Sequence, residues 1–293
     1  MKYRLLLLFL FVCSFAFAQK KLARQIDHLL VAADSFSGVI LVADMGKPVY
    51  HKAFGYADYA KRTPLKRDHI FELASISKTF TASIVLMLKE AGKLQLDDPV
   101  DKYLSIPYKG ISIRHLLTHT SGLPDYQQIM DQHWDKSRVA GNPEILEYLN
   151  RYAPPVLFEP GTRYEYSNTG YVLLGSIAEK ASGSDFVELC REKIFHPLRM
   201  NRTDIRSPQE KAATDGFTAG HSFVEDKRRY IRADSFPSSD YTIWLGNRKG
   251  PGRVSSTATD LLKWDQALYA GKLLNTQTFT EAYSPMRLND GTY

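Results

Sequence analysis

The length, composition and charge of the chain are those of an ordinary globular protein. Of its 293 residues, 44% are hydrophobic and 24% are charged, which excludes the fibrous and intrinsically disordered classes. The net charge of +6 comes from scattered lysines and arginines, apart from a triplet at 227–229 that lies beside Glu225 and Asp226. We therefore expect no nucleic-acid partner.

The first 18 residues have the pattern of a secretory signal peptide. Lys2 and Arg4 precede an unbroken apolar run over 5–12, and Ala16-Phe17-Ala18 has the form of a cleavage site. We expect an exported, periplasmic or secreted bacterial protein without a stable membrane span after cleavage. The alternative is an uncleaved anchor, although the apolar run is short for a typical transmembrane helix.

Only one cysteine, Cys190, would remain after cleavage. An internal disulfide is then excluded, which fits a bacterial envelope protein that relies on the size of its core. Cys190 lies in an apolar helical pattern and is interpreted as a buried residue rather than a catalytic thiol.

The predicted elements run from a β-rich start through a helical middle to a mixed end. Alternating apolar residues around a turn predict a β-hairpin over 38–54. Apolar residues at helical spacing predict helices over 22–33, 76–91, 173–181 and 261–269.

These elements indicate a single domain over residues 19–293. Its α/β part would comprise about 19–60 plus 250–293, and its mostly helical part about 61–249. The pattern predicts an α/β domain with a helical insertion, and the remainder of its sheet is not evident from the sequence.

Ser75 and Lys78 are a candidate catalytic pair in the segment Ser75-Ile76-Ser77-Lys78, at the start of the second predicted helix. Residues i and i+3 share a helix face, so both side chains can point into one cleft. A serine hydroxyl needs a base, and a lysine with a lowered pKa can supply it. The alternative is that Ser75 is an N-cap and Lys78 an exposed helix residue.

Tyr166-Ser167-Asn168 lies in a segment flanked by turn-forming residues. A loop tyrosine can reach a cleft and shuttle a proton to a leaving group. The neighbouring amide can hold a substrate carbonyl or the catalytic lysine. A second segment, Tyr148-Leu149-Asn150, falls in a predicted helix over 144–152, and its tyrosine is interpreted as a packing residue.

With these residues in place, the chain resembles the serine β-lactamase superfamily. It is most similar to the branch of class C β-lactamases and D-alanyl-D-alanine carboxypeptidase-like enzymes, which includes many esterases. The resemblance extends from about residue 26 to the end. It is carried by segments 71–78, 113–124 and 160–171, by Pro197-Leu198 with Met200 and Thr203, and by Ser255-Ser256-Thr257 with Asp260 and Trp264.

The resemblance implies an α+β fold, in which an antiparallel sheet is flanked by helices and carries a large mostly helical insertion. It also implies a role for each motif residue. Ser75 would be the acyl-accepting nucleophile, and Lys78 would help to deprotonate it. Tyr166 would be the general acid and base, while Asn168 would orient the substrate and Lys78. The Ser75 backbone N–H would supply one oxyanion donor. No metal or organic cofactor is implied.

His115 and His119 have the i, i+4 spacing of zinc ligands on a helix. The segment His-Leu-Leu-Thr-His lacks the glutamate of the zinc-protease motif, and no third ligand is evident. We therefore interpret both histidines as structural.

One motif of the superfamily has no match in this sequence. Its members carry a Lys-Thr/Ser-Gly or His-Thr/Ser-Gly triplet on a strand beside the nucleophile. In those proteins the triplet follows the segment to which Asp290 to Tyr293 is similar. We expect the C-terminal strands to be missing and the 293 residues to be a fragment. Such a chain would lack an oxyanion donor, worth on the order of 10²–10³ in rate, and would fold poorly and be nearly inactive by itself.

Two functions remain open from the sequence. The first is a serine hydrolase that forms an acyl-enzyme with D-Ala-D-Ala-type peptides, β-lactams or esters. The second is a non-catalytic protein that binds or senses peptidoglycan peptides or β-lactams in the same cleft. The sequence does not indicate an oligomeric state.

Overall fold

The computed structural model describes residues 21–30 and 36–293. The predicted signal peptide over 1–18 lies outside the described residues, as does the end of the first predicted helix. Residues 21–30 are helical, which confirms the part of that prediction that can be compared. Within the described ranges, no helix is both long and apolar enough to cross a bilayer.

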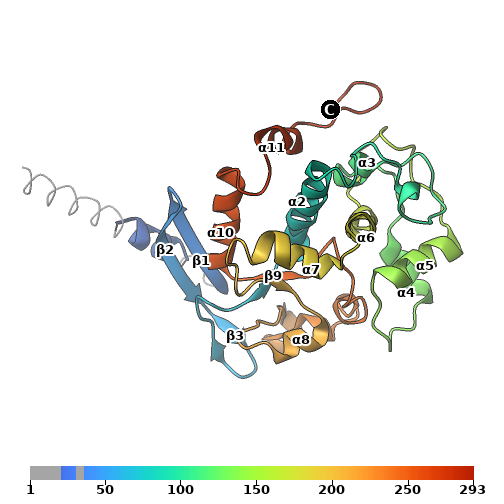
Figure 1. The fold of residues 1–293 in the computed structure, drawn as a ribbon. Coiled ribbons are helices and arrows are strands. Elements are labelled where there is room, and N and C mark those ends of the chain that lie inside the picture. Colours follow the sequence, from blue (N-terminus) through green and yellow to red (C-terminus); the bar gives the residue numbers. More distant parts are fainter. Residues whose placement is uncertain (1–20, 31–35) are drawn as a thin grey trace, which may run out of the picture.

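The predicted β-hairpin is present. Strands β1 (Gly38–Asp44) and β2 (Lys47–Phe54) pair antiparallel. Met45 and Gly46 form the turn with φ of 46° and 74°, the sign that a tight two-residue hairpin turn requires. Helix α10 (Ala258–Tyr269) packs against β1, so the hairpin is attached to the helical part through this helix (Figure 1).

Helix α2 (Ser77–Glu90) lies in the middle of the molecule (Figure 1). Its apolar residues, among them Phe80, Ile84 and Val85, are fully buried. This agrees with the helix predicted over 76–91, and Gly92 follows with a left-handed φ of 68°. Helix α2 packs against α6 (Asn168–Ser182) and α7 (Phe186–Cys190), and the candidate catalytic serine Ser75 lies just before its first residue.

Helix α6 (Asn168–Ser182) begins five residues before the predicted start at 173. The Ser167 hydroxyl accepts a hydrogen bond from the Gly170 N–H at 3.2 Å, and such an N-cap fixes where a helix starts. Gly183 ends the helix with φ of 77°. The consequence for the site is that Asn168 lies in the first turn of α6.

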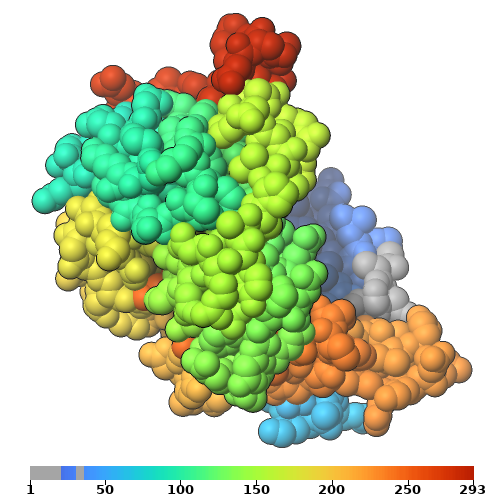
Figure 2. Space-filling view, turned by 90° about the vertical axis from the view of Figure 1, so that its right-hand side faces the viewer, coloured from blue at the N-terminus to red at the C-terminus, as the bar shows by residue number. Residues whose placement is uncertain are grey.

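The other helices surround α2 and α6. Helices α4 and α5 pack on each other and contribute to the face opposite the hairpin, which appears in green in Figure 2. Cys190 ends α7 and is fully buried, as predicted. The helices other than α2, α6 and α10 are α3 (Ile113–Leu117), α4 (Tyr126–His133), α5 (Asn142–Tyr152), α7 (Phe186–Cys190), α8 (Pro208–Ala213), α9 (Tyr241–Trp244) and α11 (Thr276–Ala282). The short helical turns are η1 (Ala74–Ile76), η2 (Val100–Lys102), η3 (Arg191–Phe195), η4 (Glu225–Lys227) and η5 (Ala233–Ser235).

A small antiparallel sheet lies next to the start of α2. Its order is β5 (Phe71–Glu72), β9 (Val254–Ser256) and β6 (Asp204–Ile205). It brings residue 254 beside residue 73, far apart in sequence, and so fixes the chain on both sides of Ser75. The other short strands are β3 (Tyr56–Asp58), β4 (Thr63–Pro64), β7 (His221–Val224) and β8 (Arg229–Arg232).

Candidate active site

Ser75 lies at a sharp transition from strand to helix. Strand β5 ends at Glu72, and the Leu73 N–H donates to the Val254 carbonyl at 2.9 Å. Ala74 then adopts φ of 47°, a left-handed conformation that is unusual for a residue other than glycine. This turn leaves the Ser75 side chain exposed and places it just before α2, where backbone N–H groups have no partner within the helix.

Lys78 lies one turn further along and is buried, with 7% of its surface exposed. Its Nζ donates to Ser75 Oγ at 3.2 Å, to Asn168 Oδ1 at 2.8 Å and to the Pro251 carbonyl at 2.9 Å. Burial lowers the pKa of the Lys78 ammonium. The hydroxyl of Tyr166 opposes this shift, whereas the positive charge of Arg248 adds to it.

Tyr166 reaches Ser75 from the loop before α6. Its hydroxyl donates to Ser75 Oγ at 2.8 Å. The ring lies over the lysine, with Nζ at 4.8 Å from the ring centroid. Residues 163–167 form no regular element, as predicted, and the tyrosine is 47% exposed. Ser75 Oγ is therefore hydrogen-bonded by two groups that can exchange protons with it.

The structure brings together all four residues that the sequence analysis singled out. Ser75 lies in η1 just before α2, and Lys78 lies in the first turn of α2. Tyr166 comes from the loop before α6, and Asn168 from the first turn of α6. Asn168 offers its amide oxygen to Lys78, which is one of the two contacts expected of it. The predicted competitor, Tyr148, lies in α5 and instead packs against the edge of Trp134, with ring centroids 5.6 Å apart.

The segment 250–254 completes the surroundings of Lys78, and the sequence analysis missed it. The Thr81 hydroxyl donates to the Gly250 carbonyl at 2.8 Å, and the Val254 N–H donates to Ser77 Oγ at 3.1 Å. Gly250 has φ of 105°, and a Cβ there would lie 2.0 Å from the Tyr171 carbonyl oxygen. Only glycine fits this approach, and the Gly-Pro-Gly sequence was the available signal.

His115 and His119 each hold a backbone group. The Nδ1 atom of His115 accepts from the Ser112 N–H at 3.2 Å and completes a capping box at α3. The Nδ1 atom of His119 accepts from the Ser167 N–H at 3.1 Å. No group of three or more His, Cys, Asp or Glu side chains in the described ranges is arranged to hold a metal ion.

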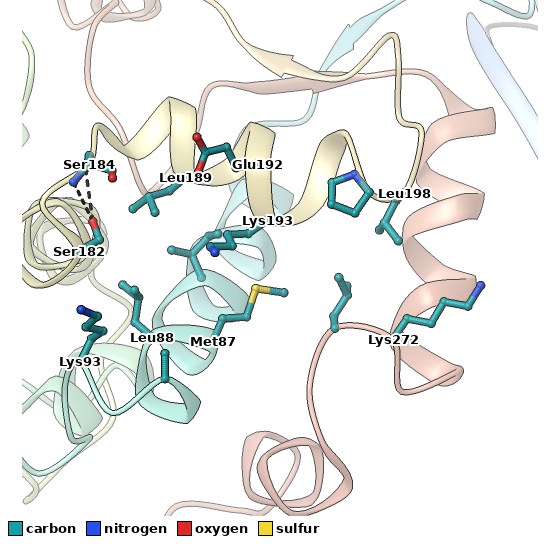
Figure 3. Close-up of a pocket in the computed structure, with 14 residues that line it drawn as sticks. Met87, Leu88, Lys93, Ser182, Ser184, Leu189, Glu192, Lys193, Leu198 and Lys272 are labelled. Carbon is teal, nitrogen blue, oxygen red and sulfur yellow. Dashed lines mark hydrogen bonds between the residues drawn. The ribbon is translucent and has the colours of Figure 1, made fainter.

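A separate cavity of about 620 Å³ lies at the other end of α2. Figure 3 shows Met87 and Leu88 of α2 facing Leu189 and Leu198 across it. It lies about 15 Å along the helix from Lys78, at a rise of 1.5 Å per residue. The Ser182 hydroxyl at its rim donates to the Ala178 carbonyl at 2.7 Å, so this cavity offers no activated nucleophile comparable to Ser75.

Comparison with known proteins identifies the family. A family model described as Beta-lactamase matches residues 22–291. The chain belongs to the beta-lactamase family. Relatives with this fold are serine hydrolases, and the superfamily resemblance predicted from the motifs is confirmed.

Individual relatives in this family cover nearly all of the chain. Penicillin-binding protein 4* of Bacillus subtilis (strain 168) is 40% identical over 275 residues, which make up 93% of this chain and 61% of that protein. The chain thus spans less than two thirds of the length of this relative.

Solved structures agree on the fold. The octameric penicillin-binding protein homologue from Pyrococcus abyssi superposes with a TM-score of 0.76 at 27% identity, covering 92% of this chain and 60% of its own. The D-amino acid amidase from Ochrobactrum anthropi SV3 superposes with a TM-score of 0.65 at 29% identity, covering 83% and 67%. The predicted α+β class is therefore confirmed.

Proposed function

We propose that the protein is an exported serine hydrolase that acts on small amides or esters through an acyl-enzyme. One observation carries this proposal: Ser75 Oγ lies 2.8 Å from the Tyr166 hydroxyl and 3.2 Å from Lys78 Nζ. A nucleophile held between two proton-exchanging groups is the arrangement that acyl transfer requires. An N-cap serine beside an exposed lysine would need none of these contacts.

The proposed reaction has two halves. Ser75 Oγ attacks the substrate carbonyl carbon as its proton passes to the Lys78–Tyr166 pair, and a tetrahedral intermediate forms. Tyr166 then donates a proton to the leaving amine or alcohol, the bond to that group breaks, and an ester to Ser75 remains. Water attacks this ester with Tyr166 as base, which releases the acid and restores the serine.

Lys78 and Asn168 set the electrostatics of these steps. Burial lowers the pKa of Lys78, so more of the neutral amine is present near neutral pH than for an exposed lysine. The Asn168 amide oxygen and the Pro251 carbonyl hold Nζ without adding a full negative charge. The Ser75 N–H at the start of the helix would donate to the developing oxyanion.

The substrate class rests on the exposed groups of the site and on the relatives. Ser75 and Tyr166 are both exposed, and the chain is similar to relatives named as a penicillin-binding protein and a D-amino acid amidase. We propose D-Ala-D-Ala-type peptides, β-lactams or simple esters as candidates, with peptidase or esterase activity preferred over a dedicated β-lactamase.

A covalent label tests this function directly. The 293-residue chain is incubated with a fluorophosphonate and, separately, with a fluorescent penicillin, and the adduct is located by mass spectrometry of peptides. We expect an adduct on Ser75 that is lost in Ser75→Ala. Ser77, two residues away and fully buried, is the internal control because it should stay unmodified. Labelling needs only one acylation event, so a site slowed on the order of 10²–10³-fold by a missing oxyanion donor should still give an adduct after prolonged incubation. Labelling at other residues, or none with either probe under those conditions, contradicts the proposal.

Export is tested at the N-terminus. The apolar run over 5–12 and the Ala16-Phe17-Ala18 pattern support cleavage before Gln19. We expect the mature protein from a bacterial envelope fraction to begin at Gln19. Recovery of the protein with Met1 and the full leader in the cytosolic fraction would argue against export.

A further inference from the structure

His119 contacts the Tyr166 loop through its backbone carbonyl, its Nδ1 atom and its ring, and no step of the proposed reaction uses it. It follows α3 in a left-handed conformation, with φ of 58°. From the contacts described below, we propose that His119 is a positioning residue that holds the Tyr166 hydroxyl on Ser75 Oγ. This inference rests on the proposed role of Tyr166 in acyl transfer.

The first two contacts bracket Tyr166 along the chain. The Glu165 N–H donates to the His119 carbonyl at 2.9 Å, and the Ser167 N–H donates to His119 Nδ1 at 3.1 Å. The residues on both sides of Tyr166 are thus held by one residue, once through its backbone and once through its side chain. With both neighbours held, the direction in which the tyrosine side chain leaves the backbone is fixed.

The third contact is between the rings. The His119 imidazole lies against the Tyr166 ring, with centroids 4.6 Å apart and an angle of 33° between the planes. Its ring also lies 5.1 Å from that of Tyr171, a residue of α6 that is 6% exposed. His119 thus supports the ring of the exposed tyrosine from the side of the protein core.

The charge state of His119 suits this role. Burial lowers the pKa of the imidazole to about 4, and the nearby positive charge of Lys78 adds to the shift. The ring is therefore neutral at neutral pH, and a neutral imidazole can accept a hydrogen bond at Nδ1. A charged imidazole would donate at both nitrogens and could not hold the Ser167 N–H.

His115 provides a matched comparison within the same segment. It accepts the Ser112 N–H through Nδ1 at 3.2 Å, so it makes the same kind of bond four residues earlier. It makes that bond at the start of α3, at the other end of this segment. Loss of such a bond costs stability at either site, but only His119 should affect Tyr166.

The test compares acylation rates in four variants of the full 293-residue chain. His119→Ala removes the acceptor and the ring, His119→Phe keeps a ring without an acceptor, and His119→Asn keeps an acceptor without the ring. His115→Asn is the control. We expect His119→Ala to lower the acylation rate constant about 10- to 100-fold, since small displacements of catalytic groups have effects of this size. The substrate dissociation constant should change less than about threefold.

The two conservative variants should each restore part of the lost rate, and His115→Asn should stay within about twofold of the unmodified chain. Circular dichroism and thermal melting verify that each variant is folded. Equal losses in His115→Asn and His119→Ala would show that His119 has only a structural role and would overturn the inference.

A double-mutant cycle with Tyr166→Phe separates positioning from general damage. If His119 acts through Tyr166, His119→Ala should cost less than about twofold once the phenol is absent. The same 10- to 100-fold loss in both backgrounds would overturn the inference.

Absence of a Ser75 adduct in the unmodified chain would instead refute the proposed function. The positioning inference would then be decided by a crystal structure of His119→Ala. A tyrosine hydroxyl still within hydrogen-bond distance of Ser75 Oγ would overturn it, and a displaced ring would support it.

Discussion

The chain contains two Tyr-x-Asn segments, and only one of them meets the nucleophile. Tyr166 and Asn168 both point at the Ser75–Lys78 pair, with contacts of 2.8 Å each. Tyr148 and Asn150 lie in α5, and their side chains serve different neighbours. The residue types and their spacing are identical, so the difference must come from the backbone.

The backbone conformation explains why one pair converges and the other does not. Ser167 is extended, with φ of −130° and ψ of 119°, and in extended chain residues i and i+2 point to the same side. In a helix, residues two apart point to different faces. Asn150 accordingly donates to the Ser105 carbonyl at 2.8 Å, whereas Tyr148 packs towards Trp134.

This contrast shows how a short motif gains chemical meaning. Here the Tyr-x-Asn pattern places its two polar groups on the Ser75–Lys78 pair because the chain is extended at its middle residue. The Ser167 N-cap supplies that conformation, because an N-cap residue has non-helical dihedral angles while the next residue already belongs to the helix. The catalytic arrangement is therefore a consequence of where α6 begins.

The largest expected difference between the two segments concerns the tyrosine hydroxyls. Tyr166→Phe removes the proton-exchanging group from Ser75, and we expect acylation to fall about 10²–10⁴-fold, the usual contribution of general acid–base catalysis. Tyr148→Phe should change it less than twofold. Stopped-flow acylation with a chromogenic ester measures both. A similar fall in the two variants would mean that the segments do not differ in the proposed way.

The asparagines should differ by a smaller factor. Asn168→Ala removes the acceptor that holds Lys78 Nζ near Ser75 Oγ. We expect about a 10- to 100-fold loss of acylation rate, because small displacements of a catalytic group have effects of this size. Asn150→Ala loses a bond to a backbone carbonyl and should lower the free energy of unfolding by about 1 kcal/mol without changing the rate. Denaturant unfolding and acylation kinetics on both variants distinguish the two effects.

The sequence indicated the candidate site residues through short, local patterns, and the family resemblance gave them their roles. Ser75 and Lys78 are one helical turn apart, and Tyr166 and Asn168 flank an N-cap, so each pair is positioned by a few neighbouring residues. The hairpin over 38–54 and the helix after residue 76 were predicted for the same reason. The convergence of the two pairs, 90 residues apart, came from the family resemblance rather than from periodicity.

The residues that the sequence did not indicate act through long-range contacts. The Pro251 carbonyl reaches Lys78 across 173 positions, and nothing in a Gly-Pro-Gly segment specifies its partner. The strands β5, β6 and β9 have two or three residues each, which is too short for alternation to be recognised. His119 was interpreted only as structural, because no zinc motif surrounds it. The sequence did not indicate its contacts with the Tyr166 loop, which join segments nearly 50 positions apart.

A further difference between the two Tyr-x-Asn segments concerns stability in acid, because the titratable residue His119 contacts the segment of Tyr166. Burial lowers the pKa of His119 from 6.5 to about 4, so the unfolded chain takes up a proton before the folded protein does. Stability from this group is present above pH 6.5 and is lost as the pH falls towards 4, at up to about 1.4 kcal/mol per pH unit. Burial also lowers the pKa values of His51, His69 and His115. Several histidines therefore contribute to the dependence of the free energy of unfolding on pH.

We expect His119→Asn to flatten part of this slope between pH 6.5 and 5, a window in which most carboxylates stay ionised. Between pH 6.5 and pH 5, the free energy of unfolding of His119→Asn should fall by about 1–2 kcal/mol less than that of the unmodified chain. Asn150→Ala, in the second segment, lowers stability without removing a titrating group and should leave the slope unchanged. Urea unfolding at several pH values gives the slopes, and parallel curves for His119→Asn and the unmodified chain would contradict the shift.

The smallest expected difference concerns two arginines, Arg248 and Arg151. Arg248 lowers the pKa of Lys78, whereas Arg151 lies over the Tyr148 ring at 5.3 Å and pairs with Glu147. Arg248→Gln should therefore raise the pKa of Lys78 and displace the acylation profile to higher pH. At neutral pH the rate should fall less than about tenfold, because each pKa unit corresponds to one factor of ten in the neutral amine.

Arg248→Lys keeps the positive charge and should retain the original profile, and Arg151→Gln should leave it in place because that arginine belongs to the second segment. Acylation rates measured from pH 6 to about 10 cover the titration of a lysine with a lowered pKa. A profile that moves to lower pH in Arg248→Gln would show that the lysine is not the group that titrates. Lys78 would then have to act as a permanently charged residue, and Tyr166 alone would carry the proton from Ser75.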